Sequence, residues 1–151
     1  MTEPWLTPDQ QRTWRAYLRM QSELQSRLNR QLQVEHGISL ADYEVMVHLG
    51  AAQDSRMRPF ELEATMQWEQ SRIAHQLARM QRRGLVERVT CPTDRRGAFV
   101  VLTEAGRDAL DKAAPGHATA VKRLLFECLS DEQLAGFEAI CTRVLSHLPV
   151  I

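Results

Sequence analysis

The segment 68–106 restricts the possible folds of this chain more than any other stretch, because it combines a one-sided helix with a hairpin. Ile73, Leu77 and Met80 recur close to helical spacing, which predicts that one stripe of this helix faces a core. The opposite face is rich in side chains that donate hydrogen bonds. These donors are Ser71, Arg72, His75, Gln76, Arg79 and Arg83.

A basic hairpin follows this helix directly. Runs of β-branched and aromatic residues predict strands at 85–89 and 98–102, and the turn between them is the polar string PTDRRG. A helix with exposed donors can enter the major groove of DNA, where base edges present a distinguishable pattern of donors and acceptors. An arginine-tipped hairpin can reach the adjacent backbone or the minor groove. The segment therefore predicts a winged helix-turn-helix that binds double-stranded DNA.

Helix caps predict a mainly helical chain around this segment. Capping residues start helices at Thr7, Ser39 and Ser130, and glycines end the first two at Gly37 and Gly50. The first helix is nearly thirty residues long, against an average of about 11–12. A long amphipathic helix in a short chain often buries one face against a partner subunit.

Two further helices complete the predicted order. A short helix opens at Pro59 and is joined to the donor-rich helix by a brief turn at 67–68, which is the spacing of a helix-turn-helix. Thr103 caps the helix that follows the hairpin, and a weaker break is predicted at 114–116. The predicted fold class is therefore mainly α (α+β), a winged helix-turn-helix with N- and C-terminal helices and one β-hairpin.

The net charge of the chain is zero, but the charge is unevenly distributed. Between positions 70 and 97 there are seven arginines and two acidic residues, so this segment carries +5 and the rest carries −5. Screening limits electrostatic reach to roughly 8 Å in cellular salt, so local rather than total charge decides phosphate binding. An arginine-rich face can also be merely solvated, but its position beside the hairpin favours DNA.

Composition excludes several other classes. The 151 residues, 44% hydrophobic and 25% charged, suit one globular domain, and we expect neither a membrane span nor a secretory signal, hence a cytoplasmic protein. Scattered histidines and a lone Cys91 predict no metal site and no cofactor. No Gly-x-Ser-x-Gly elbow is present, so we predict no enzyme. Cys128 and Cys141 are expected to be small core residues.

Three motifs resemble a known family. The string Asp94-Arg95-Arg96 followed by Leu102-Thr103-Glu104-Ala105-Gly106 resembles the wing motif of MarR-type (multiple antibiotic resistance) transcriptional regulators. The stretch 79–86 resembles the end of that family's recognition helix, and 129–134 is typical of its C-terminal helix. The resemblance covers nearly the whole chain in length and element order.

This resemblance implies a homodimeric repressor of a pseudo-palindromic operator, released by a small-molecule ligand. The helices in 1–36 and 104–151 would form the dimer, and 38–103 the winged helix-turn-helix, in one domain spanning 1–151. By the family pattern, Arg96 enters the minor groove and Asp94 holds the wing arginines, Arg95 included, by ion pairing. The groove-facing residues would be Gln70, Ser71, Arg72 and His75, with Gln76 beside them and Arg79 and Arg83 as phosphate contacts.

Regulation of such a repressor leaves alternatives open. The family's effector pocket lies between the dimer helices and the DNA-binding domain. Candidate lining residues are Trp14, Tyr17, Tyr43, Met46 and His48, although aromatics at helical spacing also suit a core. A redox-responsive regulator is an alternative, since arginines near Cys91 could lower its thiol pKa. A second alternative is a helical protein-interaction module whose arginine face binds an acidic partner.

Overall fold

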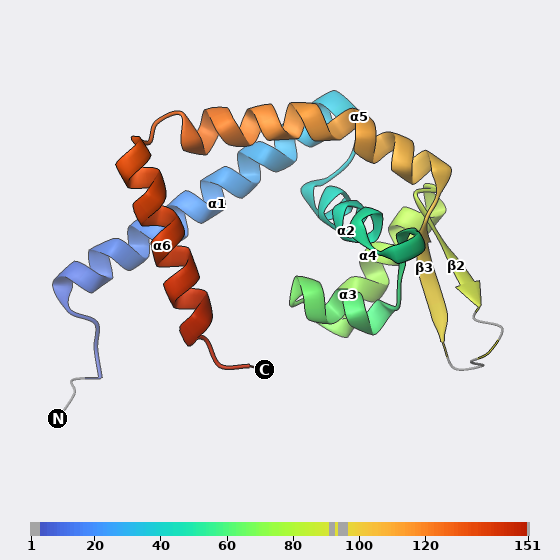
Figure 1. Cartoon of the computed structure of the whole chain (residues 1–151), viewed down its shortest axis with the longest axis horizontal. Helices are drawn as coiled ribbons and strands as arrows, with labels where there is room; N and C mark the ends of the chain where they lie inside the picture. The colour runs from blue at the N-terminus through green and yellow to red at the C-terminus, as the bar shows by residue number, and fades with distance from the viewer. Residues whose placement is uncertain (1–3, 91–92, 94–96, 151) are drawn as a thin grey trace.

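The computed structural model describes residues 4–90, 93 and 97–150, and its architecture is mainly helical with one small sheet (Figure 1). This agrees with the predicted fold class. In chain order the elements are α1 (Pro8–His36), α2 (Leu40–Ala51), a 3-10 turn (Gln53–Ser55), β1 (Arg56–Met57), α3 (Pro59–Met66), α4 (Gln70–Arg82), β2 (Val86–Thr90), β3 (Ala98–Leu102), α5 (Glu104–Val121), a π-helical turn (Lys122–Phe126) and α6 (Asp131–His147).

The predicted caps define the helix boundaries. Thr7, Ser39 and Ser130 each accept a hydrogen bond from the backbone N–H three residues on, and the side-chain oxygen at that position accepts one from the backbone N–H of the capping residue. Both bonds satisfy backbone donors that would otherwise be unpaired. Gly37 ends α1 in the left-handed region at φ 66°. Helix α2 ends at Ala51, one residue beyond the predicted Gly50.

The predicted break at 114–116 is wrong, because α5 continues through Pro115 to Val121. A proline inside a helix removes one backbone hydrogen bond, so packing must compensate. Helix α5 packs along α1, and Ala113 and Ala120 are buried there. A Cβ atom at Gly116 would lie 3.3 Å from Nε2 of Gln31, so the glycine permits the close approach of the two helices.

The sheet contains one strand more than the predicted hairpin. Strands β2 and β3 pair antiparallel as expected, with Val86 opposite Leu102 and Thr90 opposite Ala98. Strand β1 pairs with the other edge of β3, giving the order β1-β3-β2 in a three-stranded sheet. Residues 56–57, for which the sequence predicts no strand, are therefore an edge strand formed by a long-range contact.

Helices α1 and α5 run side by side along the top of Figure 1, while α2–α4 and the sheet lie together at the right. The hydrophobic core lies among α2–α4 and the sheet, and it also includes Leu32 near the end of α1. Its fully buried members include Leu32, Val45, Met46, Leu49, Leu62, Ile73, Met80 and Val100. Among the described residues, no helix is long and apolar enough to cross a membrane.

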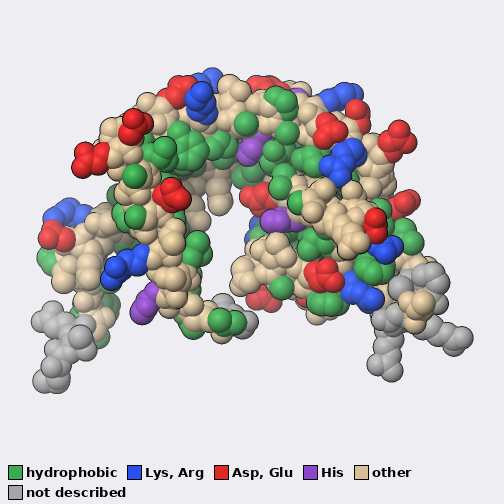
Figure 2. Space-filling model, in the orientation of Figure 1, with side chains coloured by type: hydrophobic (Ala, Val, Ile, Leu, Met, Phe, Trp, Pro, Cys, Tyr) green, Lys and Arg blue, Asp and Glu red, His purple; other side chains and the backbone are tan. Residues whose placement is uncertain are grey.

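Helix α6 is different, because none of its residues is buried. Helix α6 and the first half of α1 both lie at the left of Figure 1, and we call these two segments the limb. Figure 2 shows hydrophobic side chains on the surface of this limb. The exposed large hydrophobic side chains of the limb include Trp14, Tyr17, Leu18, Leu134, Ile140, Val144, Leu145 and Leu148.

Candidate nucleic-acid interface

Helices α3 and α4 form the predicted helix-turn-helix. Three residues join them, and the first, Gln67, adopts a left-handed conformation at φ 55° that turns the chain sharply. Trp68 is half-buried and packs against the core between the two helices. Helix α4 begins at Gln70, and the side chain of Glu69 makes no capping hydrogen bond.

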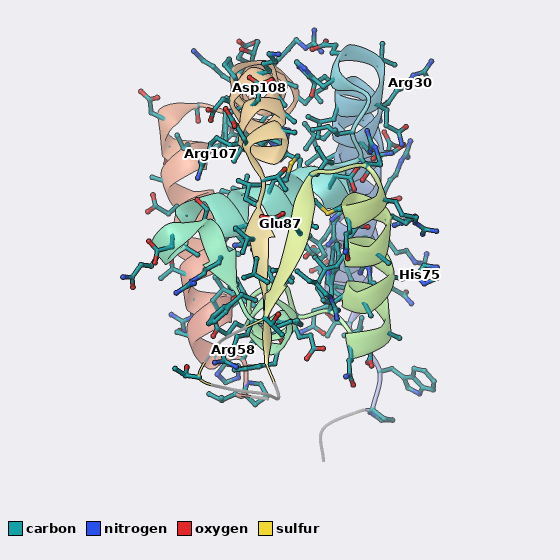
Figure 3. All side chains as sticks on the ribbon, turned by 90° about the vertical axis from the view of Figure 1, so that its right-hand side faces the viewer. Arg30, Arg58, His75, Glu87, Arg107 and Asp108 are labelled. Atoms are coloured by element: carbon teal, nitrogen blue, oxygen red, sulfur yellow. The ribbon has the colours of Figure 1, made fainter. Side chains whose placement is uncertain are left out.

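Helix α4 presents one buried stripe and one exposed face. Ile73, Leu77 and Met80 are buried, as their spacing predicts. In Figure 3 the side chain of His75 points away from the sheet. The predicted DNA-binding residues of this helix that lie on its exposed surface are Gln70, Ser71, Arg72, His75 and Arg79.

Gln76 is a correction, because only 2% of it is exposed. It stands three residues after Ile73 and four before Met80, so it belongs to the buried stripe. Its Nε2 donates a hydrogen bond of 2.5 Å to Oδ1 of Asp42, a buried side chain of α2. Burial of the amide is tolerable because it is hydrogen-bonded. Gln76 therefore acts inside the protein and is not a surface contact.

The two arginines predicted to contact phosphate also bond within the protein. Nη2 of Arg79 donates to Oε1 of Gln76 at 2.7 Å. Nη1 of Arg83 donates to Oδ2 of Asp42 at 3.1 Å, and its Nη2 donates to the carbonyl oxygen of Gly37 at 2.6 Å. Asp42, which the sequence did not identify as functional, therefore bonds directly to Arg83 and is connected to Arg79 through Gln76.

A second cluster lies at the beginning of α4. The guanidinium of Arg72 stacks over the ring of Trp68 at 3.7 Å from the centroid. Burial raises the pKa of Glu44 on α2 above its ordinary value of 4.5, and the charges of His48 and Arg72 partly oppose this rise. Arg72 is thus positioned by an aromatic face in addition to its own helix.

The hairpin is also basic near its turn, where Phe99 pairs with Val89. Phe99 of β3 lies beneath two guanidinium groups, those of Arg56 at 4.5 Å and Arg58 at 4.8 Å from its ring centroid. In Figure 3 Arg58 lies toward the lower end of the hairpin. The candidates Asp94, Arg95 and Arg96, and the thiol of Cys91, lie outside the described residues.

Comparison with known proteins identifies this arrangement. A profile of the MarR family matches residues 36–97, which span the helix-turn-helix and part of the hairpin. The chain is 35% identical to Sco3205, a MarR family transcriptional regulator from Streptomyces coelicolor solved in complex with DNA. The two structures agree with a TM-score of 0.91 over 99% of this chain and 93% of that one. The chain belongs to the MarR family.

Other members of the MarR family are also similar. AbsC from Streptomyces coelicolor is 35% identical, with a TM-score of 0.88 over 96% of this chain and 97% of its own. The transcriptional repressor MprA of Escherichia coli K12 is 25% identical over 89% of this chain and 75% of its own length. The protein is thus a DNA-binding transcriptional regulator of the MarR family, with the predicted winged helix-turn-helix fold and no enzymatic role.

The five candidate effector residues of this MarR-family chain do not converge within one protomer. Trp14 and Tyr17 stack on each other, with centroids 5.6 Å apart, and both are about half exposed. Tyr17 precedes Asn29 by 12 residues, or about 18 Å of helix at 1.5 Å per residue, and it is Asn29 whose Oδ1 accepts from the backbone N–H of Leu40 at the start of α2. Met46 is fully buried in the core, so it lines no surface pocket. The aromatic ring of Tyr43 instead contacts His117 of α5, with centroids 4.3 Å apart.

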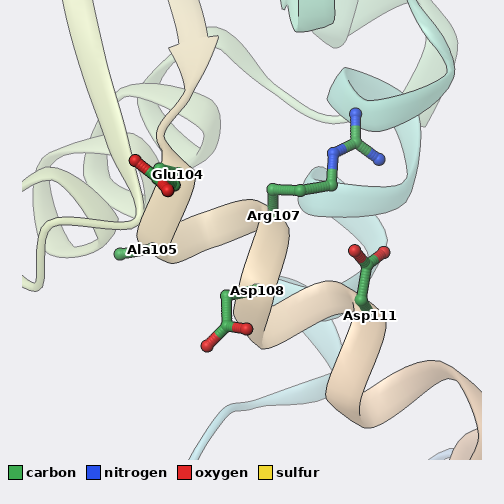
Figure 4. A pocket seen from close by; sticks show the side chains of 5 residues that line it. All are labelled: Glu104, Ala105, Arg107, Asp108 and Asp111. Atoms are coloured by element: carbon green, nitrogen blue, oxygen red, sulfur yellow. The ribbon is translucent and has the colours of Figure 1, made fainter.

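Two surface depressions lie elsewhere. One is lined by Glu104, Ala105, Arg107, Asp108 and Asp111 at the start of α5 (Figure 4). Arg107 makes a structural contact there, because its Nη2 donates to the carbonyl oxygen of Gly50 and to Oγ of Ser55. The other lies beside β1 and Phe99. Neither depression includes a candidate effector residue. Within the described part of the chain, no three His, Cys, Asp or Glu side chains are grouped to hold a metal ion.

The expectation that Cys128 and Cys141 are core residues is wrong, because both are exposed in the chain. Cys128 follows the π-helical turn, and its Sγ donates to the carbonyl oxygen of Leu125 at 3.2 Å. Cys141 lies on α6, which buries no side chain in one protomer. Helical periodicity predicted an apolar face correctly but could not tell whether the same chain covers it.

Proposed function

We propose that this MarR-family protein binds a pseudo-palindromic operator as a homodimer and represses transcription until a small molecule releases it. The observation that carries the proposal is the exposed face of α4. It presents Ser71, Arg72, His75 and Arg79 on one side of a helix whose other side is packed into the core. These side chains can donate to base edges and phosphates when the helix lies in the major groove.

The relatives support the proposed DNA contact. Sco3205, which shares 35% of its sequence with this chain, was crystallised with DNA. The hairpin completes the interface, with Asp94, Arg95 and Arg96 at the turn as proposed wing contacts. Exposed Arg88 and Thr90 of β2 continue the polar surface toward that turn. Phosphate contacts of this kind position the protein, while contacts to base edges specify the sequence.

The exposed limb supports the proposed homodimer. Ile140 is 63% exposed and Leu145 is 69% exposed on α6, and Trp14 is 51% exposed on α1. Soluble monomers rarely leave large contiguous apolar patches in water. A second copy of the limb would cover these side chains in an isologous interface and place two α4 helices to read two half-sites.

The junction of α1, α2 and α5 supports a site for the effector. Nδ1 of His117 and Oε1 of Gln31 are buried there, and no described residue is hydrogen-bonded to either atom, which is unfavourable unless a ligand supplies a partner. Tyr43 of α2 packs against His117 of α5, and His48, also on α2, is half-buried. CouR from Rhodococcus jostii RHA1, 27% identical with a TM-score of 0.71 over 88% of this chain and 91% of its own, was crystallised with p-coumaroyl-CoA. A ligand at this junction would release DNA only if it binds the DNA-incompetent state more tightly.

Selection from a random duplex library tests the proposal. The selected duplexes should share two inverted half-sites about one helical turn apart, and native mass spectrometry should find two protein chains on each duplex. Enrichment of no common sequence would exclude the regulator and favour the protein-interaction module.

A further inference from the structure

We propose that Asp42 is a positioning residue for DNA binding: it orients the amide of Gln76, which in turn holds the guanidinium of Arg79 in place on the exposed face of α4. This inference rests on the proposed function, in which Arg79 contacts the DNA backbone. It adds a buried residue, from a different helix, that determines how the recognition helix presents one of its contacts.

The carboxylate of Asp42 is the centre of a buried polar network. Its side chain is 9% exposed and lies in the first turn of α2. Oδ1 accepts from Nε2 of Gln76 at 2.5 Å. Oδ2 accepts from the backbone N–H of Ser39 at 2.9 Å and from Nη1 of Arg83 at 3.1 Å. Three donors therefore face a group that, when ionised, can only accept.

This acceptor fixes the direction of the Gln76 amide. Because the carboxylate of Asp42 accepts only, the NH2 group of Gln76 must face it, and the carbonyl oxygen must face the other way. Arg79 carries only donors, and its Nη2 bonds to that carbonyl oxygen at 2.7 Å. Asp42 thus determines which end of the Gln76 amide faces the guanidinium of Arg79. A neutral amide at position 42 would permit the reversed Gln76, which would turn its NH2 group toward the guanidinium.

Arg83 gives the network a second attachment to the first helix. Its Nη2 donates to the carbonyl oxygen of Gly37, which ends α1, while its Nη1 bonds to Asp42. Asp42 therefore bonds to two residues of the recognition helix and its end. One is Gln76, within α4, and the other is Arg83, which caps the C-terminal end of α4. The position of the recognition helix is in this way joined to the end of α1.

A double-mutant cycle on DNA affinity tests the assignment. The substitutions Asp42→Asn and Arg79→Ala are made singly and together, and Kd is measured by fluorescence anisotropy for the selected duplex at one salt concentration. Asp42→Asn should weaken binding about tenfold in the wild-type background, the effect of losing one charge-assisted contact. In the Arg79→Ala background it should have little further effect. Asp108→Asn, which makes the same change at an exposed carboxylate of α5, should not weaken binding.

A purely structural role for Asp42 gives a different pattern. Loss of stability alone would lower DNA affinity by the same factor whether or not Arg79 is present, and that additivity would overturn the proposal, as would unchanged affinity of Asp42→Asn. Should Asp42→Asn fail to fold, Gln76→Leu is used in the same cycle, because it keeps the buried volume and removes both the acceptor of Arg79 and the donor to Asp42. The wild-type titration tests the proposed function separately, since it depends on none of these variants.

Discussion

The guanidinium of Arg72 lies 3.7 Å above the ring centroid of Trp68, so the first turn of α4 is joined to the turn that precedes it. Trp68 is packed against the core and cannot easily move. A planar guanidinium on an aromatic face is held by cation–π attraction of about 0.5–1 kcal/mol at exposed sites. Arg72 is therefore partly ordered in the free protein, which would lower the entropy lost in the proposed contact with DNA.

The first prediction concerns this stack. Arg72→Lys retains the charge but loses the planar fork and its stacking, so we expect preference for the selected duplex over a scrambled one to fall about tenfold. Anisotropy titration of both duplexes measures the ratio. Arg123→Lys, the same change in the π-helical turn, is the control and should leave the ratio unchanged. An unchanged ratio in Arg72→Lys would show that only the charge of Arg72 matters.

The second prediction concerns His117, whose pKa is lowered by burial against the ordinary value of 6.5. The folded state binds the proton less readily than the unfolded state, so the free energy of unfolding should fall as the pH drops below 6.5. His117→Phe keeps a ring against Tyr43 and cannot titrate. The free energy of unfolding, measured in urea at about pH 7.5 and about pH 5.5, should therefore decrease less in this variant than in the wild type. The two decreases should differ by at most about 1.4 kcal/mol.

His75→Phe is the matched control for that measurement, since it makes the same substitution on the exposed face of α4. It should lose as much stability between the two pH values as the wild type. Equal losses in His117→Phe and the wild type would contradict the assignment of this pH dependence to His117.

The third prediction concerns Glu44, whose pKa burial raises above 4.5. As the pH rises above 4.5, this carboxyl ionises in the unfolded state before it ionises in the folded state. Glu44 therefore lowers the free energy of unfolding progressively as the pH rises toward neutrality. Glu44→Gln should therefore be more stable than the wild type at neutral pH and should lose less stability between acidic and neutral pH. Chemical denaturation measures both. Glu138→Gln, at an exposed position of α6, should show neither effect.

The fourth prediction concerns the apolar limb. Ile140→Asp places a charge in the proposed dimer interface, where an unpaired carboxylate is costly, so the protein should become monomeric and lose operator affinity. Sedimentation velocity measures the mass. Thr142→Asp introduces the same charge two residues further along α6 and should leave the dimer intact. A dimer that persists in Ile140→Asp would place the interface elsewhere.

The sequence predicted those features that depend on short-range patterns. Thr7, Ser39 and Ser130 bond to backbone groups three residues away, so their effect is visible in the sequence itself. Strand β1 was missed because its two residues become a strand only by pairing with Val100 and Val101. A two-residue strand has too few positions to show alternation.

The candidate site was predictable in part for the same reason. The exposed donors of α4 could be recognised because they alternate with an apolar stripe. Gln76 was misplaced because its residue type is polar, although its spacing from Ile73 and Met80 is that of a buried position. Its partner Asp42 lies 34 residues earlier in the chain. No local pattern connects two side chains that meet only after the helices pack.

The central claim is that the exposed face of α4 reads DNA sequence. The most direct measurement is an anisotropy titration of wild type, His75→Ala and Arg79→Ala against the selected duplex and a scrambled duplex at about 0.15 M salt. We expect the wild type to prefer the selected duplex at least about 1,000-fold. His75→Ala should reduce that preference by the equivalent of about 1–3 kcal/mol, whereas Arg79→Ala should weaken binding to both duplexes alike. Equal affinity of the wild type for the two duplexes would contradict the account.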